Sequence, residues 1–524
     1  MDDGSPAGLD AVRQQWPDAR DRYNECFHHK GAHMADVAIP SDITVLDNFI
    51  GGRWVKVQTE EFFDVHNPAV GEIIGRTPLS TAADVDAAVR EATQAFPAWR
   101  DTPVNGRAQV LFRLKAQLEQ HFDELARIVT TEHGKTLDEA RGSVRRAVEC
   151  VEVACGAPSL MQGSALEDIA QGIDCHVVRQ PLGVCAAIAP FNFPAMVPMW
   201  FLPFAIVTGN TFVLKPSEQV PFSMRRMMEL LQESGLPSGV VNVVNGGREV
   251  VDAICDHPGI RAVSFVGSTP VARHVYQRAT HAGKRVQALG GAKNFIVVMP
   301  DADLDRSMSA ITESFYGCAG ERCLAGSMLV PVGEAHRDTR ERLIESAKRL
   351  KVGDGSQPGV TMGPVISARH RDRVVGYIGR GEAEGAKLLL DGREIRVADR
   401  PNGYFVGPTV FDQVSTGMAI GHDEIFGPVA SIAPVKTLAE AIAVLQSHPN
   451  ANATSIFTSS GKAAREFAKH ATASMVGVNI GVAAPMAYFP FGGAKDSFFG
   501  DLKVHGRDAF EFYTDKKVTI SRWF

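Results

Sequence analysis

A cysteine beside a fixed positive charge is the most reactive arrangement in this sequence. The stretch FYGCAGERCLAG, residues 315–326, places Cys318 and Cys323 five residues apart among small side chains, and Arg322 directly precedes Cys323. A neighbouring cation lowers the pKa of a thiol, and the thiolate is the nucleophilic form. Small side chains also let other molecules approach the sulfur closely. We therefore expect Cys323 to be a nucleophile and Cys318, which lacks a charged neighbour in the sequence, to be a buried inert thiol.

Two further groups indicate a nucleotide site. In KPSE, residues 215–218, Lys215 and Glu218 follow an apolar run, so both side chains could bond a ribose diol at the end of a strand. In FVGSTP, residues 265–270, Ser268 stands between a strand and a helix, where backbone N–H groups can hold a phosphate. Each pattern is also typical of an ordinary strand–helix turn or a solvated helix start, so alone each leaves both interpretations open.

The elements that must position these groups alternate in type. Helical periodicity begins near residue 80. From about residue 183, short apolar runs such as GVCAAIAP, TFVLKP, VVNVVNG and AVSFVG alternate with helical segments, which is typical of a doubly wound parallel sheet. A second strand–helix series begins at NFIVVMP, residues 294–300. The sequence thus predicts two α/β domains with a seam near residue 290.

Composition excludes several classes of partner. The 524 residues carry a net charge of −6 without a lysine- or arginine-rich run, which argues against nucleic acid and anionic membranes as partners. The eight cysteines form no C-x-x-C pair or zinc-ligand spacing, so we expect reduced, cytoplasmic thiols and no metal.

The apolar run 194–209 contains Pro198 and Pro203 and is shorter than the roughly 20 residues of a membrane span, so it predicts one buried helix. Residues 1–43 lack an apolar signal core and are predicted to be a flexible extension.

Several motifs in order carry a family resemblance. PFNFP (190–194), KPSE, FVGS, GERC and EIFGPV (424–429) resemble the NAD(P)-dependent aldehyde dehydrogenase superfamily from about residue 44 to the C-terminus. Within it, GKRVQALGGAKN, AGERCLA and the tail from FPFGGAKDSFFG onward are similar to the CoA-acylating methylmalonate- and malonate-semialdehyde dehydrogenases. The resemblance implies an α/β fold with a Rossmann-like NAD-binding domain (44–165 and 188–289) and an α/β catalytic domain (290–507). It also implies a small β oligomerisation element (166–187 and 508–524) in a homotetramer or homodimer.

The resemblance also assigns roles to residues. Cys323 matches the nucleophile, and Asn192 matches the side chain that stabilises the oxyanion together with the backbone N–H of Cys323. A carboxylate at Glu218 would repel a 2′-phosphate, which favours NAD over NADP. The residues expected to contact NAD are Ala189, Phe191, Lys215, Glu218, Gln219, Ser268, Gly290, Glu424 and Phe426.

Two arginines are expected to bind a carboxylate on the substrate. Arg322 precedes the nucleophile, and Arg146 in ARGSVRRAVE matches the second arginine of the semialdehyde subfamily. Guanidinium groups suit carboxylates geometrically. The alternative for Arg146 is a surface position on a helix, and Arg141, Arg145 and Lys135 are neighbours without an expected role.

One departure from the wider superfamily concerns deacylation. Hydrolytic aldehyde dehydrogenases carry a glutamate in an E-L-G-G-K motif, whereas this chain reads QALGGAKN, with Ala288 or Leu289 at that position. A thioester without a nearby base favours attack by a thiol such as coenzyme A, although another residue could supply the base. We expect NAD-dependent, CoA-acylating oxidation of methylmalonate or malonate semialdehyde, with decarboxylation to propanoyl-CoA or acetyl-CoA, CO2 and NADH. The alternatives are a non-acylating dehydrogenase of another small aldehyde and a catalytically silent scaffold protein.

Overall fold

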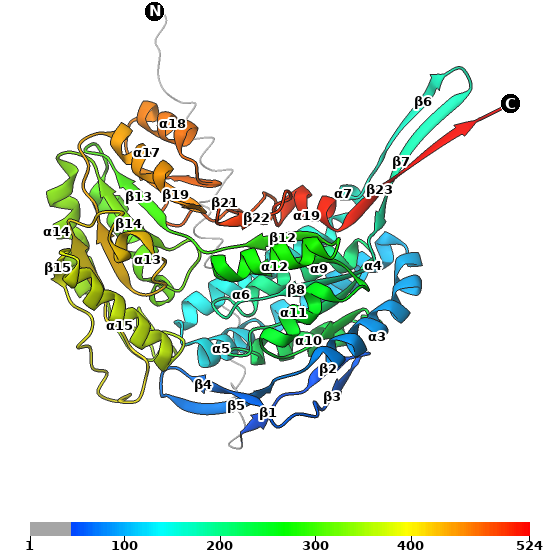
Figure 1. Ribbon diagram of the computed structural model, residues 1–524, viewed down its shortest axis with the longest axis horizontal. Helices are drawn as coiled ribbons and strands as arrows, with labels where there is room; N and C mark the ends of the chain where they lie inside the picture. Colours follow the sequence, from blue (N-terminus) through cyan, green and yellow to red (C-terminus); the bar gives the residue numbers. More distant parts are fainter. Residues whose placement is uncertain (1–42) are drawn as a thin grey trace, which may run out of the picture. The chain divides into compact units, whose positions relative to one another are not determined.

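The structure is a computed structural model that describes residues 43–524 (Figure 1). The extension predicted over residues 1–43 lies outside the described residues except for Ile43. Two large sheets organise the described part, and a small three-stranded sheet, β1-β5-β4, lies at its start. Its strands are β1 (Thr44–Val45), β4 (Phe62–Asn67) and β5 (Glu72–Pro78).

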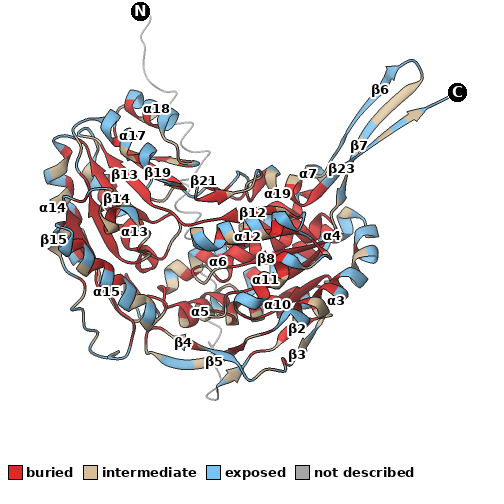
Figure 2. Cartoon of the chain, in the orientation of Figure 1, coloured by how far each residue is buried: buried red, intermediate tan, exposed pale blue. Residues whose placement is uncertain are grey.

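The first large sheet has eight strands in the order β22-β12-β11-β8-β9-β10-β2-β3. The central strands from β12 to β10 are parallel, and most of their residues are apolar and buried (Figure 2). The strands are β2 (Asn48–Ile50), β3 (Arg53–Val55), β8 (Val184–Ile188), β9 (Thr211–Lys215), β10 (Val241–Val243), β11 (Ile260–Val266), β12 (Arg285–Leu289) and β22 (Phe498–Phe499).

Helices cover both faces of this sheet. On one face the core contains residues of α3 (Ala82–Asp101), α11 (Arg248–Asp256) and α12 (Thr269–His281). On the other face the core contains residues of the remaining helices of this region. They are α4 (Val104–Gln120), α5 (Phe122–His133), α6 (Leu137–Cys155), α7 (Ala157–Leu160), α8 (Met196–Met199), α9 (Leu202–Val207), α10 (Phe222–Glu233) and α19 (Gly506–Phe512). Thr136 and Glu139 form a capping box that begins α6.

The second large sheet has seven strands in the order β15-β16-β17-β14-β13-β19-β20, all parallel except β15. The strands are β13 (Asn294–Val298), β14 (Gly326–Pro331), β15 (Lys387–Leu390), β16 (Thr409–Asp412), β17 (Val429–Ile432), β19 (Ala453–Phe457) and β20 (Met475–Val478). The helices are α13 (Leu304–Tyr316), α14 (Ala335–Lys348), α15 (Ala368–Ala383), α16 (Ala419–His422), α17 (Leu438–Ser447) and α18 (Gly461–His470). A two-stranded pair, β18 (Asn450–Ala451) with β21 (Ala494–Lys495), lies outside this sheet.

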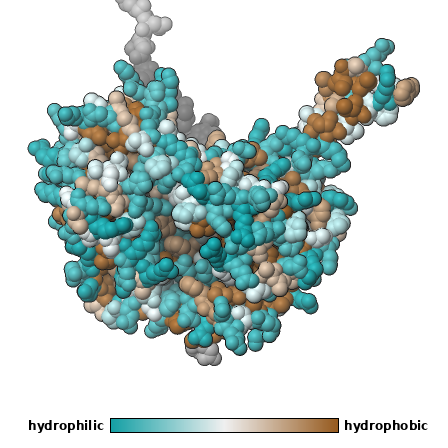
Figure 3. Space-filling view, in the orientation of Figure 1, coloured by the Kyte–Doolittle hydropathy of each residue, from teal (hydrophilic) through white to brown (hydrophobic). Residues whose placement is uncertain are grey.

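A third sheet, which we call the arm, projects from the rest of residues 43–524 (Figure 1). Its order is β23-β7-β6, from β6 (Ser164–Ala170), β7 (Ile173–Pro181) and β23 (Thr514–Arg522). Figure 3 shows apolar side chains on its surface. Every residue of β6 is exposed, which is unusual for a strand with apolar side chains.

The domain boundaries differ in part from the predicted division. The chain passes from the first large sheet to the second between Leu289 and Asn294, at the seam predicted near residue 290. Residues 184–187, predicted to belong to the oligomerisation element, instead lie in β8 of the first sheet, because that strand pairs with β9 and β11. Strand β22, within the predicted catalytic segment 290–507, pairs with β12 and so completes the edge of the first sheet.

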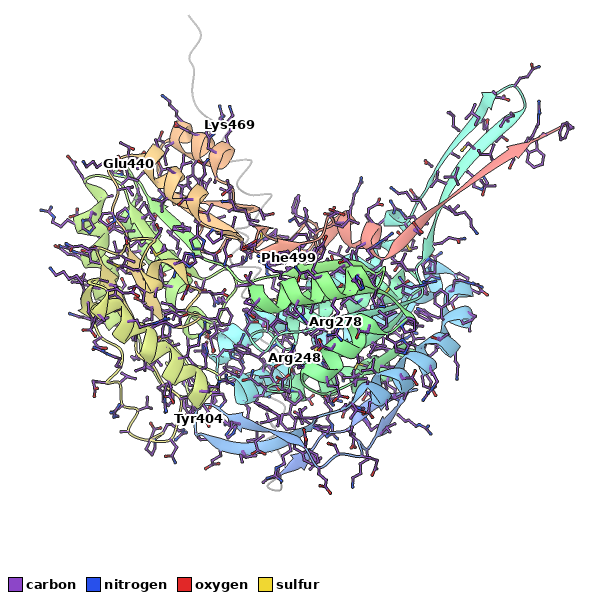
Figure 4. All side chains as sticks on the ribbon, viewed as in Figure 1. Arg248, Arg278, Tyr404, Glu440, Lys469 and Phe499 are labelled. Atoms are coloured by element: carbon purple, nitrogen blue, oxygen red, sulfur yellow. The ribbon has the colours of Figure 1, made fainter. Side chains whose placement is uncertain are left out.

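Packing around α12 explains why β22 belongs to the first sheet. The ring of Phe499 lies 5.9 Å from that of Tyr276, and the Arg273 guanidinium lies 5.0 Å from the Phe499 ring. Phe499 and Arg278 are labelled in Figure 4, where α11 and α12 lie together, and Arg278 pairs with Asp256 of α11 at 2.6 Å. The contacts of Phe499 form only once the chain returns from the second sheet, so a division of the sequence into consecutive segments could not show them.

The apolar run 194–209 forms two short buried helices, α8 and α9, where one helix was predicted. The break falls at Trp200 and Phe201, between Pro198 and Pro203. Within residues 43–524, no helix is long and apolar enough to cross a membrane.

Candidate active site

Two cavities meet at Cys323. The larger, which we call the large cavity, has a volume of ≈ 880 Å³ and lies at the carboxyl ends of β8, β9 and β11, facing residues 422–426 of the second domain. The small cavity, ≈ 450 Å³, lies among α6, α8 and the segment 482–491. Cys323 lines both cavities. Its sulfur can therefore meet one molecule from each side.

The backbone around Cys323 is fixed by asparagines that were not predicted as site residues. Asn294 and Asn452 each donate an Nδ2 hydrogen bond of 2.9 Å to the carbonyl oxygen of Cys323. Asn294 is the last residue of the quoted GAKN motif and the first residue of β13, but the motif alone does not indicate that its side chain reaches the Cys323 carbonyl. Both asparagines come from the second sheet, because Asn294 begins β13 and Asn452 directly precedes β19.

The electrostatics of Cys323 differ from the expectation. Burial and the nearby charge of Glu424 raise the pKa of Cys323 to about 12, although backbone N–H groups of Cys323 and Leu324 lower it. Arg322 also lowers this pKa, but its effect is the smallest of these causes. Desolvation therefore raises the pKa of Cys323 by more than the neighbouring Arg322 lowers it, so the expected activation of the thiol by Arg322 does not occur in the free protein.

The Arg322 guanidinium faces the other cysteine. Its Nε donates to Cys318 Sγ at 3.3 Å, and its terminal nitrogens lie 3.5 Å from Glu139 and 3.4 Å from Glu313. The prediction that Cys318 lacks a charged neighbour was therefore wrong. The reason is that the turn between residues 318 and 322 folds back, so residues four apart face each other.

That turn is strained. Cys318 and Ala319 have φ values of 50° and 52°, a left-handed conformation that costs a non-glycine residue about 1–3 kcal/mol. Gly320 follows with φ 77°, and a Cβ there would lie 2.2 Å from the carbonyl oxygen of Gly427. Glu139 of α6 supports the turn, because its Oε1 accepts the Cys318 N–H at 2.5 Å. Strained backbone held by its surroundings is common at functional sites.

Asn192 is held between the two halves of the molecule. Its Nδ2 donates to the carbonyl oxygen of Glu321 at 3.0 Å, which leaves its second amide hydrogen for another acceptor. Lys135 donates from Nζ to the Asn192 carbonyl oxygen at 2.6 Å and lies 3.7 Å from the centre of the Phe193 ring. Lys135 was expected to have no role, but it is buried and holds this backbone in place.

The structure brings Arg146 and Arg322 to the same cavity. Both line the small cavity with Cys323. Arg146, on α6, pairs with Glu149 at 3.0 Å and contacts Met486 Sδ at 2.9 Å, while its side chain stays 36% exposed. Arg146 is thus a cavity residue that retains access to solvent. Arg141, in contrast, pairs on the surface with Asp123 at 2.9 Å.

Eight of the nine positions predicted for NAD contacts line the large cavity. They are Ala189, Phe191, Lys215, Glu218, Ser268, Gly290, Glu424 and Phe426. The ninth, Gln219, lies outside this lining, and its backbone N–H donates to Ser217 Oγ. After Glu218 the chain turns away from the large cavity toward α10, so Gln219 does not line it.

Charged groups in the large cavity are placed at its two ends. Lys215 Nζ pairs with Glu218 at 2.7 Å beyond β9. Glu424 accepts the Ala292 N–H at 2.9 Å, and burial raises the pKa of its carboxyl to about 7. A Cβ at Gly291 would lie 2.3 Å from Glu424 Oε2, so a larger residue there would displace the carboxylate. Ser268 marks the start of α12, whose free N–H groups can bind an anion.

Ala288 and Leu289 end strand β12 and are both buried in apolar cores. No carboxylate occupies either position, and neither residue is among those that line the two cavities. Among residues 43–524, no group of three or more His, Cys, Asp or Glu side chains could hold a metal ion. The groups available for chemistry at the site are the thiol of Cys323, the amide of Asn192, the carboxyl of Glu424 and the guanidinium groups of Arg146 and Arg322.

Comparison with known proteins gives one consistent result. The Aldehyde dehydrogenase family matches residues 54–519. A curated relative, malonate-semialdehyde dehydrogenase 2 of Geobacillus kaustophilus (strain HTA426), is 51% identical over 481 residues, which cover 92% of this chain and 99% of that protein.

Two solved structures are also similar. Methylmalonate-semialdehyde dehydrogenase from Oceanimonas doudoroffii aligns with a TM-score of 0.90 and 46% identity, covering 92% of this chain and 99% of that chain. A protein from Sinorhizobium meliloti 1021, assigned as a methylmalonate-semialdehyde dehydrogenase and solved in complex with NAD, aligns with a TM-score of 0.91 and 43% identity over the same shares.

Proposed function

The chain belongs to the aldehyde dehydrogenase family, and we propose that it catalyses NAD-dependent, CoA-acylating oxidation of malonate or methylmalonate semialdehyde. The single observation that carries this proposal is the position of Cys323, where a cavity with two guanidinium groups meets a larger cavity at the strand ends. The names of the similar proteins support the choice of a semialdehyde substrate.

The large cavity fits NAD. Its volume of ≈ 880 Å³ lies within the range of about 300–1,000 Å³ typical of ligand sites, and it occupies the strand ends where nucleotides bind in open parallel sheets. Lys215 and Glu218 would hold the adenosine ribose, Ser268 the pyrophosphate and Glu424 the nicotinamide ribose. NAD, when bound, supplies the hydride acceptor.

Cys323 carries the acyl group through the reaction. Its sulfur adds to the aldehyde carbon, and the second amide hydrogen of Asn192 stabilises the oxyanion that forms. Loss of hydride from that carbon leaves a thioester on Cys323. The high pKa of the free thiol means that deprotonation must accompany substrate binding, and Glu424, with a pKa of about 7 and in the same cavity, is placed to accept the proton.

The two arginines would bind the carboxylate of the substrate from the small cavity. Arg322 and Arg146 offer N–H donors in planar forks that match a carboxylate. In a thioester with a β-carboxylate, the thioester carbonyl accepts the electrons released with CO2. The bond between the carboxylate carbon and the α-carbon then breaks and CO2 leaves the two arginines. The α-carbon of the resulting thioester enolate takes up a proton from solvent, which leaves an acetyl or propanoyl group on Cys323.

The residues at the end of β12 favour a thiol as the final acceptor. Ala288 and Leu289 offer no base for an attacking water, whereas the thiol of CoA reacts readily with a thioester at almost no change in free energy. Glu424 is the observation that favours the second candidate, a non-acylating dehydrogenase, because its carboxylate could activate water.

An assay of CoA dependence tests the proposal. With NAD and malonate semialdehyde, we expect a single stoichiometric burst of NADH without CoA, and steady turnover at least about tenfold faster when CoA is added, since the thioester lacks a base for hydrolysis. The comparison variant is Leu289→Glu, because Leu289 belongs to the apolar cluster against which Cys323 packs, whereas Ala288 packs on the other face of the sheet; a carboxylate at residue 289 should raise turnover without CoA. NADH formation at the same steady rate with and without CoA would reject the acylating reaction and leave the non-acylating candidate.

The arm is the surface through which we propose that subunits associate. Its strand pairing sets Val518 opposite Val177, and Ile520 and Leu166 opposite Cys175, so these five side chains lie on one face. Leu166, Val518 and Ile520 are 65%, 58% and 66% exposed. An apolar face of this kind on a projecting sheet is typical of a subunit interface.

Charge on this face should disrupt the assembly. We expect the double variant Leu166→Asp, Ile520→Asp to sediment as a smaller species than the wild-type tetramer or dimer, because two buried charges would have to be desolvated at the interface. Lys517→Asp, which lies on the opposite face of β23, is the control and should keep the wild-type mass. If light scattering gave the double variant the same mass as the wild type, the arm would not be part of the subunit interface.

A further inference from the structure

Glu321 is a fully buried carboxyl group with incomplete hydrogen bonding. Its side chain is 0% exposed, and its Oε1 accepts the N–H of Ile366 at 3.1 Å. Its Oε2 has no hydrogen-bond partner among the described residues and lies 3.8 Å from Nε2 of His133. His133 is also 0% exposed, and neither of its ring nitrogens has a partner within residues 43–524. Such unpaired buried groups are rare and call for an explanation.

The surroundings of this carboxyl favour its neutral form. Burial raises the pKa of Glu321 well above its ordinary value, and it lowers those of His133 and His370. The ring of His370 must carry its proton on Nε2, because that atom lies 2.7 Å from the carbonyl oxygen of Phe426, which can only accept. The same Nε2 lies 3.5 Å from Glu321 Oε1. Lys135 is the cation whose charge partly offsets the burial of Glu321.

The backbone of Glu321 connects this pocket to the reacting groups. Its carbonyl oxygen accepts the Asn192 Nδ2 at 3.0 Å, and its N–H donates to the Cys318 carbonyl oxygen at 2.9 Å. Cys323 follows two residues later. A displacement of Glu321 would therefore move both the amide that faces the oxyanion and the sulfur that forms the bond.

The strained turn requires such an anchor. Cys318 and Ala319 keep a costly left-handed conformation only if contacts on both sides hold them. Glu139 supplies the contact at the beginning of the turn through the Cys318 N–H. At its end, the Glu321 side chain is the group that enters the protein interior, between His133 of α5 and Ile366 ahead of α15.

We propose that Glu321 is a positioning residue, which as a neutral carboxylic acid between His133 and Ile366 holds the turn so that the Asn192 amide and the Cys323 sulfur face the same carbon atom. This inference rests on the proposed role of Cys323 as the nucleophile. It assigns no chemical step to Glu321 itself.

Two substitutions separate hydrogen bonding from charge. Glu321→Gln keeps the acceptor for Ile366 and has no charge, whereas Glu321→Met keeps the length and loses all hydrogen bonding. We expect the NADH burst rate with malonate semialdehyde to stay within about twofold of wild type in E321Q and to fall at least about tenfold in E321M, because misplacement of reacting groups lowers rates steeply. The rate of Cys323 alkylation by iodoacetamide should change in parallel, and NAD affinity in a fluorescence titration should stay within about twofold.

The control is another buried glutamate that accepts backbone N–H groups. Glu132 is 1% exposed and accepts the N–H groups of Phe222 and Ser223 at the start of α10. Glu132→Met should lower the thermal midpoint without changing the burst rate, so stability and positioning are measured apart. If E321M does not fold, Glu321→Ala serves in its place.

Three results would overturn the proposal. A burst rate in E321Q as low as that in E321M would mean that the ionised carboxylate takes part in the chemistry. Wild-type burst and alkylation rates in E321M would mean that the side chain has no role. An equal loss of burst rate in E132M would mean that any buried glutamate of this region has the same effect. If turnover did not depend on CoA, the proposed function would be wrong. The burst rates of the Glu321 variants would still test this inference, because the burst precedes the step that uses CoA.

Discussion

Replacement of Cys323 by alanine is expected to lower the rate of NADH formation by about 10⁴-fold with malonate semialdehyde, NAD and CoA. The physical reason is that hydride can leave only after the trigonal aldehyde carbon has become tetrahedral, and the sulfur is the atom that adds to it. Among residues 43–524, Cys323 is also the one residue that lines both cavities, and it carries a nucleophilic atom. The measurement is the absorbance of NADH over a long incubation at high enzyme concentration.

The control variant is Cys255→Ala. Cys255 is a buried cysteine in α11, packed in the core on the face of the first sheet that α3 and α12 cover. Its replacement by alanine leaves a small cavity, so the thermal midpoint should fall slightly. The rate of NADH formation should stay within about twofold of wild type. Cys323→Ser keeps the size of the side chain and should be as slow as Cys323→Ala, because a hydroxyl is a much weaker acid than a thiol and stays protonated, and therefore poorly nucleophilic, beside Glu424. If Cys323→Ala formed NADH at a rate close to that of wild type, a covalent mechanism through Cys323 would be excluded.

The parallel sheets could be predicted from the sequence because their pattern is local. Strands such as β8 and β9 are continuous apolar runs, and they are buried at every position. The motifs at their ends were placed correctly for the same reason, since the carboxyl ends of parallel strands meet at one edge. Lys215 and Ser268, 53 residues apart in the numbering, therefore line one cavity.

The electrostatics of the site could not be predicted in this way. Arg322 adjoins Cys323 in the sequence, yet its guanidinium contacts Cys318, because Glu139 of α6 draws it to the other side of the turn. Lys135 looks like a surface residue of a loop but lies under Asn192. In both cases the partner that fixes the charged side chain, Glu139 or Asn192, is distant in the sequence. The sequence therefore shows that a charge is present but not which group it contacts.

Replacement of Arg322 by glutamine is expected to lower kcat/KM for malonate semialdehyde by about 10²–10³-fold. The reason is that truncating one partner of a buried, hydrogen-bonded charge pair costs about 2–5 kcal/mol. The side chain of Arg322 is only 13% exposed, so water could not replace its contact with a substrate carboxylate. The effect should appear in the comparison of two substrates, malonate semialdehyde and propanal, measured by NADH formation in the presence of CoA.

Arg322 has a structural role too, and the choice of substrates separates the two roles. Its loss leaves Glu139 without its cation and removes the contact with Cys318, which should lower the rate with both aldehydes by the same factor. Only the loss of carboxylate binding acts on malonate semialdehyde alone. We therefore expect propanal oxidation to fall by less than about tenfold in Arg322→Gln.

A matched control comes from the same region. Arg141 lies on α6 but pairs with Asp123 and Asp138 at the surface, outside the lining of the small cavity. Arg141→Gln should leave the ratio of kcat/KM values for the two aldehydes unchanged, whereas Arg146→Gln should shift it in the same direction as Arg322→Gln. If Arg322→Gln lowered both aldehydes equally and Arg146→Gln changed neither, the carboxylate would have to be bound elsewhere. The two guanidinium groups would then serve only to hold the strained turn and α6 in place.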